Sequence, residues 1–186
     1  MTEDRPVRVK MVMVGDKAVG KSSLGVFYIL GSLPWYLPQI GQTGDKRIIK
    51  NGRHYIINLN DTGSGDEYDR LRPLIYPNAE VMLLCFSVDN KESLERIQTK
   101  YNGEVMLYCP RVPRLLVACK TDLRETCEET ISYDEGVAMG NKLGLKYHET
   151  SVTNNTGVEE CFSAAVEEAE LYKLLIQRKP RRCTLL

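Results

Sequence analysis

Residues 15–22 read Gly15-Asp16-Lys17-Ala18-Val19-Gly20-Lys21-Ser22 and fit the phosphate-binding pattern G-x-x-x-x-G-K-[ST]. They follow the apolar run Val9 to Val14, part of a strand predicted over residues 7–14, and precede a helix predicted over residues 22–30. Glycines in such a loop let backbone N–H groups surround phosphate oxygens, and the helix N-terminus adds its positive dipole end. We expect the Lys21 ammonium to reach the outer phosphates and the Ser22 hydroxyl to ligate Mg²⁺.

Strand-like and helix-like patterns alternate along the rest of the chain. Asn51-Gly52 is a strong hairpin signal between strands predicted at residues 46–50 and 54–59. Strands alternating with helices predict an α/β fold with a mostly parallel sheet, whose ligand lies at the carboxyl ends of the strands. The remaining predictions are strands at residues 81–88, 115–119 and 146–150, a short helix near 68–71, and helices from about 90 to 101, at 134–143 and at 157–177.

The composition fits a single domain with a sizeable core. The 25 basic and 25 acidic residues balance, so no broad basic field indicates nucleic-acid binding. The polar N-terminus does not resemble a signal peptide, and no apolar run approaches the ~18 residues of a membrane span. The cysteines lack a C-x-x-C pair or a histidine at metal-ligating spacing, which predicts reduced thiols in the cytosol; they are Cys85, Cys109, Cys119, Cys127, Cys161 and Cys183.

Three further segments follow predicted strands and indicate a magnesium-bound guanine nucleotide. Asp61 lies at a strand end, where it is placed to hold the Mg²⁺ shell. Asp122 offers one carboxylate to both the N1–H and the N2–H₂ of guanine, whereas adenine has no such donor pair and would leave the acid unpaired. The aliphatic stem of Lys120 can cover a base face. We expect backbone N–H groups of residues 150–152 to face the O6 edge of the base.

The segments GDKAVGKS, DTG, CKTD and TSV, in this order and spacing, resemble the Ras superfamily of small GTPases. Residues 66–124 resemble the Rho/Rac family in particular. The resemblance implies a P-loop α/β domain with a six-stranded, mostly parallel sheet and about five helices. It also implies a GTP/GDP switch that uses Mg²⁺ and acts on the actin cytoskeleton or membrane traffic. The implied partners of this monomer are an exchange factor, effectors and a prenyl-binding chaperone.

The resemblance also carries family roles onto this chain. The implied Mg²⁺ ligands are Ser22, Gln39 and Asp61. The implied nucleotide-binding residues are Gly15, Asp16, Lys17, Ala18, Val19, Gly20, Lys21, Ser22, Ser23, Asp61, Lys120, Asp122, Leu123, Ser151, Val152 and Thr153.

Two departures from the family pattern bear directly on hydrolysis. Lys17 replaces a Gly that faces the γ-phosphate, so its side chain occupies space needed by the attacking water and by an activator's arginine finger. Residues 61–65 read D-T-G-S-G instead of D-T-A-G-Q, so Gly65 stands where the water-orienting Gln belongs. Ser64 replaces a Gly whose N–H meets the γ-phosphate. The changes at positions 17 and 65 act on the transition state, so they lower the rate and do not require weaker binding.

Other departures affect the switch and the base pocket. Gln39 replaces the Mg²⁺-ligating Thr of the first switch, and residues 39–42 do not match the family's effector sequence. Cys119 replaces the Asn or Thr that braces the base. Residues 124–134 are too few for the extra helix of typical Rho proteins.

These residues predict a GTP-binding protein with little or no stimulated hydrolysis, similar to the atypical, GTP-locked Rho proteins. Two alternatives stay open. The protein is a conventional cycling GTPase if Asp66 or Glu67 orients the water, or if Lys17 itself stabilises the developing charge. It is a nucleotide-insensitive scaffold if the altered switch loops fail to close on the γ-phosphate, because a ligand shifts a conformation only through differential contacts.

The C-terminal residues predict membrane attachment. Cys183-Thr184-Leu185-Leu186 is a C-a-a-X prenylation box whose final Leu favours geranylgeranylation. A single prenyl chain anchors weakly, and the basic residues just upstream add attraction to anionic lipid. We therefore expect a G-domain over residues 1–177 and a flexible tether over 178–186, at the cytoplasmic face of the plasma membrane or an endomembrane and in the cytosol. The upstream basic residues are Arg178, Lys179, Arg181 and Arg182.

Overall fold

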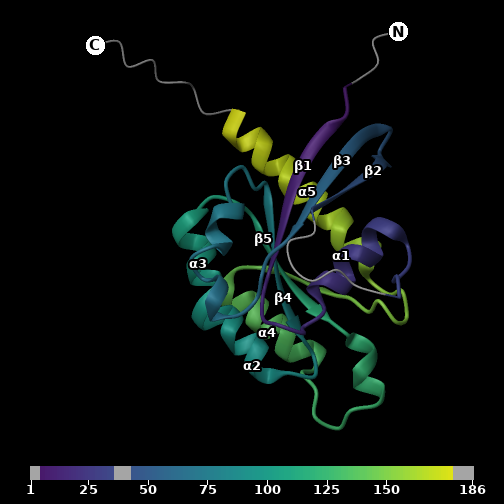
Figure 1. Cartoon of the computed structure of the whole chain (residues 1–186), viewed down its shortest axis with the longest axis vertical. Coiled ribbons are helices and arrows are strands. Elements are labelled where there is room, and N and C mark those ends of the chain that lie inside the picture. The colour runs from purple at the N-terminus through teal and green to yellow at the C-terminus, as the bar shows by residue number, and fades with distance from the viewer. Residues whose placement is uncertain (1–4, 36–42, 178–186) are drawn as a thin grey trace.

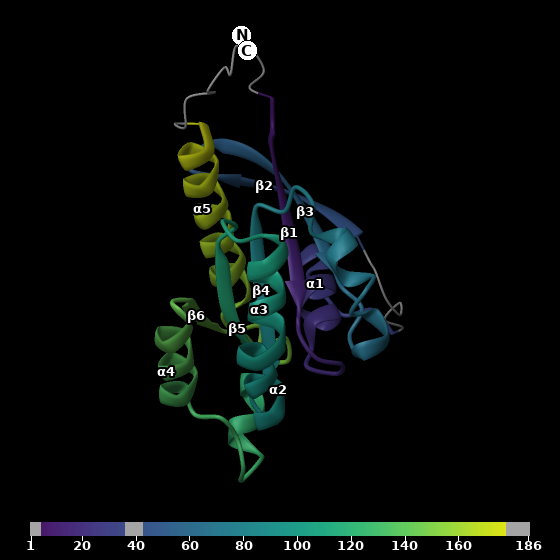
Figure 2. The same cartoon turned by 90° about the vertical axis from the view of Figure 1, so that its left-hand side faces the viewer.

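The computed structural model describes residues 5–35 and 43–177 as a six-stranded sheet covered by helices on both faces (Figures 1 and 2). The strand order is β2-β3-β1-β4-β5-β6, with β2 antiparallel to β3 and every other neighbouring pair parallel. The strands are β1 (Val7–Val14), β2 (Thr43–Lys50), β3 (Arg53–Asp61), β4 (Val81–Ser87), β5 (Arg114–Cys119) and β6 (Lys146–Glu149). The helices are α1 (Lys21–Leu30), α2 (Lys91–Arg96), α3 (Asn102–Tyr108), α4 (Tyr133–Leu143) and α5 (Val158–Gln177).

The central strands are buried on both faces, as a parallel sheet between helices requires. Along β1, Met11 and Met13 pack into one core with α1 and α5. The alternate residues Val12 and Val14 pack into a second core with the helices on the other face. This two-sided burial explains why the strand sequences are continuously apolar rather than alternating, and it confirms the predicted α/β fold.

The predicted elements are confirmed with three corrections. Helix α2 begins after Asn90, whose side chain accepts a hydrogen bond from the Ser93 N–H, but the helix does not end near Tyr101. It passes through a π turn at Ile97–Tyr101 and continues as α3 to Tyr108, so α2 and α3 form one helical body. Two 3₁₀ turns, Asp66–Tyr68 and Arg72–Ile75, replace the single short helix expected at residues 68–71. Strand β2 begins three residues earlier than predicted.

Several predicted features lie outside the described residues. They are Gln39, the segment 39–42, the basic residues of the tail and the prenylation cysteine Cys183. Between the 3₁₀ turn Thr121–Glu125 and α4, the chain has no helix. None of the helices in the described ranges is long and apolar enough to cross a membrane.

Candidate nucleotide-binding site

The loop between β1 and α1 depends on glycine at its two defining positions. Gly15 has a φ of 148°, and a Cβ there would lie 2.0 Å from the carbonyl oxygen of Cys85. Gly20 has a φ of 105°, and its Cβ would lie 3.3 Å from Cys119 Cβ. Ala18 also has a positive φ, of 62°. The loop therefore folds tightly over β4 and β5 at Gly15 and Gly20, where a side chain would collide with Cys85 or crowd Cys119.

Lys21 is buried at the start of α1, with 4% of its surface exposed. Its ammonium donates to the carbonyl oxygens of Gly15 (2.9 Å) and Asp16 (2.7 Å) and to Ser64 Oγ (2.6 Å). Burial lowers the pKa of Lys21, while the neighbouring carboxylate of Asp61 opposes the shift. The Lys21 ammonium thus contacts mainly neutral oxygen atoms in the loop. A bound phosphate would supply the negative charge that it lacks.

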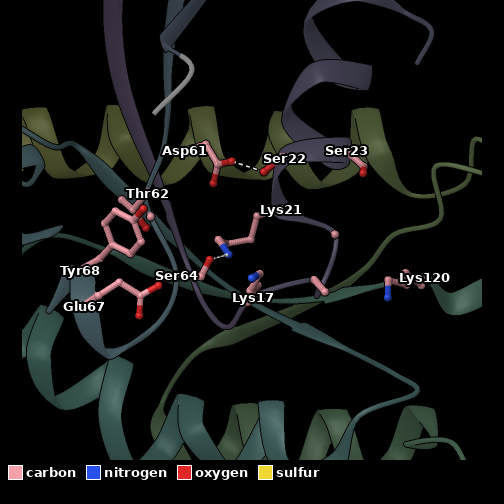
Figure 3. Close-up of a pocket in the computed structure, with 13 residues that line it drawn as sticks. Lys17, Lys21, Ser22, Ser23, Asp61, Thr62, Ser64, Glu67, Tyr68 and Lys120 are labelled. Atoms are coloured by element: carbon pink, nitrogen blue, oxygen red, sulfur yellow. Dashed lines mark hydrogen bonds between the residues drawn. The ribbon is translucent and has the colours of Figure 1, made fainter. Parts of the chain in front are cut away.

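Ser22 and Asp61 converge beside this lysine, as Figure 3 shows. The Ser22 hydroxyl donates to Asp61 Oδ2. Asp61 Oδ1 is buried and has no hydrogen-bond partner within the described ranges. Burial raises the pKa of Asp61, against the lowering effects of Ser22 and Lys21. Hard oxygen ligands with one unpaired carboxylate oxygen are the donor set that Mg²⁺ prefers, so these residues fit the ion.

A cavity of about 410 Å³ opens above these groups (Figure 3). Lys17 lines it, so the lysine at the usual Gly position does face the phosphate site. The other lining residues are Ala18, Gly20, Lys21, Ser22, Ser23, Asp61, Thr62, Gly63, Ser64, Glu67, Tyr68 and Lys120.

Asp16 and Val19 are predicted site residues whose side chains lie elsewhere. Asp16 accepts a hydrogen bond from Tyr101 OH (2.7 Å) and pairs with Arg96 Nε (3.3 Å), so only its backbone is available to phosphate. Val19 is buried in the core with α1 and α5. Asp16 and Val19 therefore contribute only backbone atoms to the site.

The predicted base-recognition residues meet at the ends of β5 and β6. Ser151 Oγ donates to Asp122 Oδ1 (2.6 Å), which fixes the carboxylate predicted to bind guanine. Lys120 has a φ of 59° and lies between the phosphate cavity and a second cavity that Asp89 also lines. Leu123 and Val152 pack partly against the two cores, and Thr153 is exposed. The strands therefore bring the phosphate and base motifs to the same edge of the sheet.

The structure separates Asp66 from Glu67, the two acids next to Gly65. Asp66 Oδ1 pairs with Arg96 (3.0 Å) and Lys100 (2.6 Å), both on the helix that runs through the π turn. Glu67 instead lines the phosphate cavity. Of these acids, only Glu67 is placed to act on a group bound there.

Tyr68 is a cavity residue that the sequence reasoning missed. Its ring lies against the backbone of Gly63, where an added Cβ would be 2.4 Å from Tyr68 Cδ1. The signal was present in the sequence, since Gly63 replaces the usual Ala of the D-T-A-G-Q pattern. A glycine there creates the space into which the aromatic ring packs.

Comparison with known proteins identifies the family. Residues 10–171 match the Ras family model. The chain is 38% identical to the GTP-binding protein rho1 of Schizosaccharomyces pombe, with 97% of this chain and 98% of that protein covered. This protein is a Rho-family member of the Ras superfamily. It is also 41% identical to the Rho-related protein racE of Dictyostelium discoideum, over 90% of this chain and 81% of that protein.

Members of the Rho family bind GTP and GDP together with Mg²⁺ and are GTP hydrolases. They interact with exchange factors, effectors and chaperones. The loop, the Ser22–Asp61 pair and the Asp122–Ser151 pair supply groups for the phosphates, the Mg²⁺ ion and the guanine base of such a nucleotide. Lys17 and Glu67 line the phosphate cavity, and Gly65 precedes Glu67 by two residues. This Rho-family protein therefore departs from the common pattern at the reacting end of the site.

Proposed function

We propose that this protein is a membrane-tethered, GTP-binding signalling module with weak or absent GTP hydrolysis. The observation that carries the proposal is the Lys17 side chain in the lining of the phosphate cavity. Gly65, at the sequence position of the usual water-orienting Gln, supports it. Intrinsic hydrolysis in this superfamily is already slow, on the order of 10⁻⁴ s⁻¹, and an arginine finger adds roughly 10³–10⁵-fold. A lysine in the finger's path removes that acceleration.

In this proposal each residue has a defined role toward the nucleotide. Backbone N–H groups of residues 15–20 and the Lys21 ammonium hold the phosphates, and Asp122 selects guanine. Ser22 and Asp61 would hold Mg²⁺, with Gln39 as the candidate third ligand. The ion, when bound, would neutralise charge on the phosphate oxygens. Lys17 strengthens ground-state binding of the nucleotide without accelerating its hydrolysis, because it adds no contact specific to the transition state.

The tail supplies the proposed location. Geranylgeranylation of Cys183, aided by Arg178, Lys179, Arg181 and Arg182, would hold the G-domain at the cytoplasmic face of the plasma membrane or an endomembrane. There the protein would act on the actin cytoskeleton or membrane traffic as a monomer. Its partners would be an exchange factor, effectors and a prenyl-binding chaperone. The unusual residues 39–42 favour effectors other than the common Rho-binding ones.

A conventional cycling GTPase is the second candidate, and the position of Glu67 favours it. Glu67 lines the cavity, so its carboxylate is available to orient a water. The third candidate is a nucleotide-insensitive scaffold, which binds nucleotide only as a structural element or does not bind it at all.

Nucleotide released from freshly purified protein, followed by single-turnover GTP hydrolysis with Mg²⁺, tests the three candidates. Bound GTP and negligible turnover, with faster turnover in Lys17→Gly, would support the proposal. The matched control is Lys142→Ala, which changes an exposed lysine on α4. Bound GDP with ordinary turnover would establish the conventional enzyme, and purified protein that neither carries nor binds nucleotide would establish the scaffold.

A further inference from the structure

The exposed face of α5 changes from acidic to apolar near the C-terminal end of the helix. The core-facing residues of this helix include Phe162, Val166 and Ala169, which are fully buried. Up to residue 170, the side chains off the core are largely acidic: Glu159, Glu160, Glu167, Glu168 and Glu170. In the last two turns, leucines replace them.

Leu171, Leu174 and Leu175 are spaced i, i+3 and i+4, so they form one stripe along the helix. Their exposed fractions are 53%, 51% and 64%. The core-facing positions are continued instead by Tyr172, which packs partly against the sheet, and by Lys173, which pairs with Glu80. The stripe therefore points away from the core, on a face where a globular domain would ordinarily carry polar side chains.

Basic groups surround the same end of the molecule. Figures 1 and 2 both place the C-terminal end of α5 beside the start of β1 and the β2–β3 hairpin. Arg8 on β1 and Arg53 on β3 have side chains that are 72% and 58% exposed, and they pair with Asp45 (3.9 Å) and Glu170 (3.4 Å). The chain beyond Gln177 adds four basic residues and the prenylation cysteine.

We infer that the leucine stripe of α5 (Leu171, Leu174 and Leu175) inserts into the interface of an anionic lipid bilayer and orients the G-domain on the membrane. The inference rests on the proposed tethering. Cys183 is the sixth residue after Gln177, so a chain rising at most ~3.6 Å per residue keeps the prenylated cysteine within about 22 Å of the end of α5, which carries the stripe. The tail supplies attraction to anionic headgroups, and the leucines supply apolar area to bury.

The acidic part of α5 limits how the helix meets the membrane. Glu160 and Glu167 lie on the helix face that leads to Leu171 and Leu174. Glu167 pairs with Lys50 (2.7 Å), whereas anionic headgroups would repel the exposed Glu160. The helix therefore does not lie flat. It meets the bilayer by its last two turns, with the β2–β3 hairpin and Arg53 nearby and the nucleotide site at the other ends of the strands.

The test uses the prenylated full chain and vesicles of phosphatidylcholine with or without phosphatidylserine. Leu171→Gln combined with Leu175→Gln removes apolar area from the stripe. The matched control is Leu74→Gln combined with Leu107→Gln, which changes two leucines elsewhere that are 73% and 75% exposed. We expect the stripe variant to partition into phosphatidylserine vesicles about tenfold less than the parent, and the control to stay within about twofold.

Cys183→Ser separates this inference from the proposed tethering. If Cys183→Ser loses binding while the stripe variant binds as the parent does, the tail alone anchors the protein and the inference is wrong. If the parent binds no better than Cys183→Ser, the lipid tether itself fails. Amide hydrogen exchange then decides the inference separately: vesicles must slow exchange at residues 171–177 but not in α4, and unchanged exchange overturns it. A dimer in solution that the stripe variant dissociates would assign the face to a second copy instead.

Discussion

The Glu67 carboxylate lies where a side chain at residue 65 would begin. A Cβ built on Gly65 would be 2.4 Å from Glu67 Oε2 and 2.8 Å from Glu67 Cδ. The backbone of Gly65, with φ 105° and ψ 164°, is in a region that only glycine adopts readily. The Glu67 carboxylate therefore occupies space that a side chain at position 65 would need. Glu67 can take this position in the cavity because residue 65 is a glycine and not the usual Gln.

Gly65→Gln should destabilise the protein rather than simply restore the family residue. The backbone strain costs about 1–3 kcal/mol, and Glu67 must also leave its position. Urea unfolding of the Mg²⁺-free protein measures the change. Gly103→Gln is the matched control, because Gly103 lies in α3 with no positive φ and nothing within 4 Å of an added Cβ. That control should be neutral or slightly stabilising, and equal stability of the two variants would contradict the prediction.

Glu67→Ala should lower whatever GTP hydrolysis the parent retains by about tenfold or more, because it removes the acid that lines the phosphate cavity. Glu67→Gln keeps a water-orienting oxygen and should retain more of the rate. Single-turnover hydrolysis at saturating Mg²⁺ compares them. Asp66→Asn is the control, since Asp66 pairs with Arg96 and Lys100 away from the cavity. A Glu67→Ala rate equal to that of the parent would exclude this role.

Arg72→Met should destabilise the fold by about 3–5 kcal/mol, because it leaves a mostly buried carboxylate without its partner. The Arg72 side chain is fully buried and donates to Glu104 through Nε (2.9 Å) and Nη2 (2.7 Å), and to Asp69 (2.6 Å). Glu104 also accepts from Tyr76 OH. Chemical unfolding measures the loss, and Arg70→Met, at an exposed neighbour, should change stability by less than about 0.5 kcal/mol.

Local patterns were sufficient to predict the sheet, but not the full length of the central helix. The apolar runs of β1 and β4, and the Asn51-Gly52 turn, determine structure through neighbours in sequence. Beyond the π turn, Gly103 weakens helix propensity and favours an end near Tyr101. The helix continues because Val105 is buried in the core shared with Met82 and Leu84. Tertiary packing thus outweighs the local preference.

The candidate site, too, was predictable from local sequence only in part. The sequence placed its motifs at the ends of strands, and the parallel sheet brings those ends together. Which acid faces the phosphate cavity was not predictable in this way. Asp66 is held away by Arg96 and Lys100, which are 30 and 34 residues further along the chain. The choice between Asp66 and Glu67 therefore depends on long-range contacts rather than on the D-T-G-S-G segment itself.

His148 should make stability fall as the pH is lowered below about 6.5. It lies half-buried on β6, and its Nε2 has no hydrogen-bond partner in the part of the chain that the structure describes. Burial lowers the pKa of His148, Lys146 lowers it further, and Glu168 opposes both. Because the folded-state pKa lies below the unfolded value of about 6.5, the unfolded chain binds more protons in the window between them.

In that window, stability rises with pH by at most about 1.4 kcal/mol per pH unit for this one group, and it is lost as the pH falls. His148→Leu removes the titration, so the stability of the parent relative to the variant should decrease between pH 7.0 and pH 5.5. Urea unfolding at the two pH values measures this difference. The matched control is His54→Leu, at an exposed histidine on β3, which should leave the pH dependence of the parent in place. A His148→Leu variant that loses as much stability as the parent over the same range would show that other groups control the pH response.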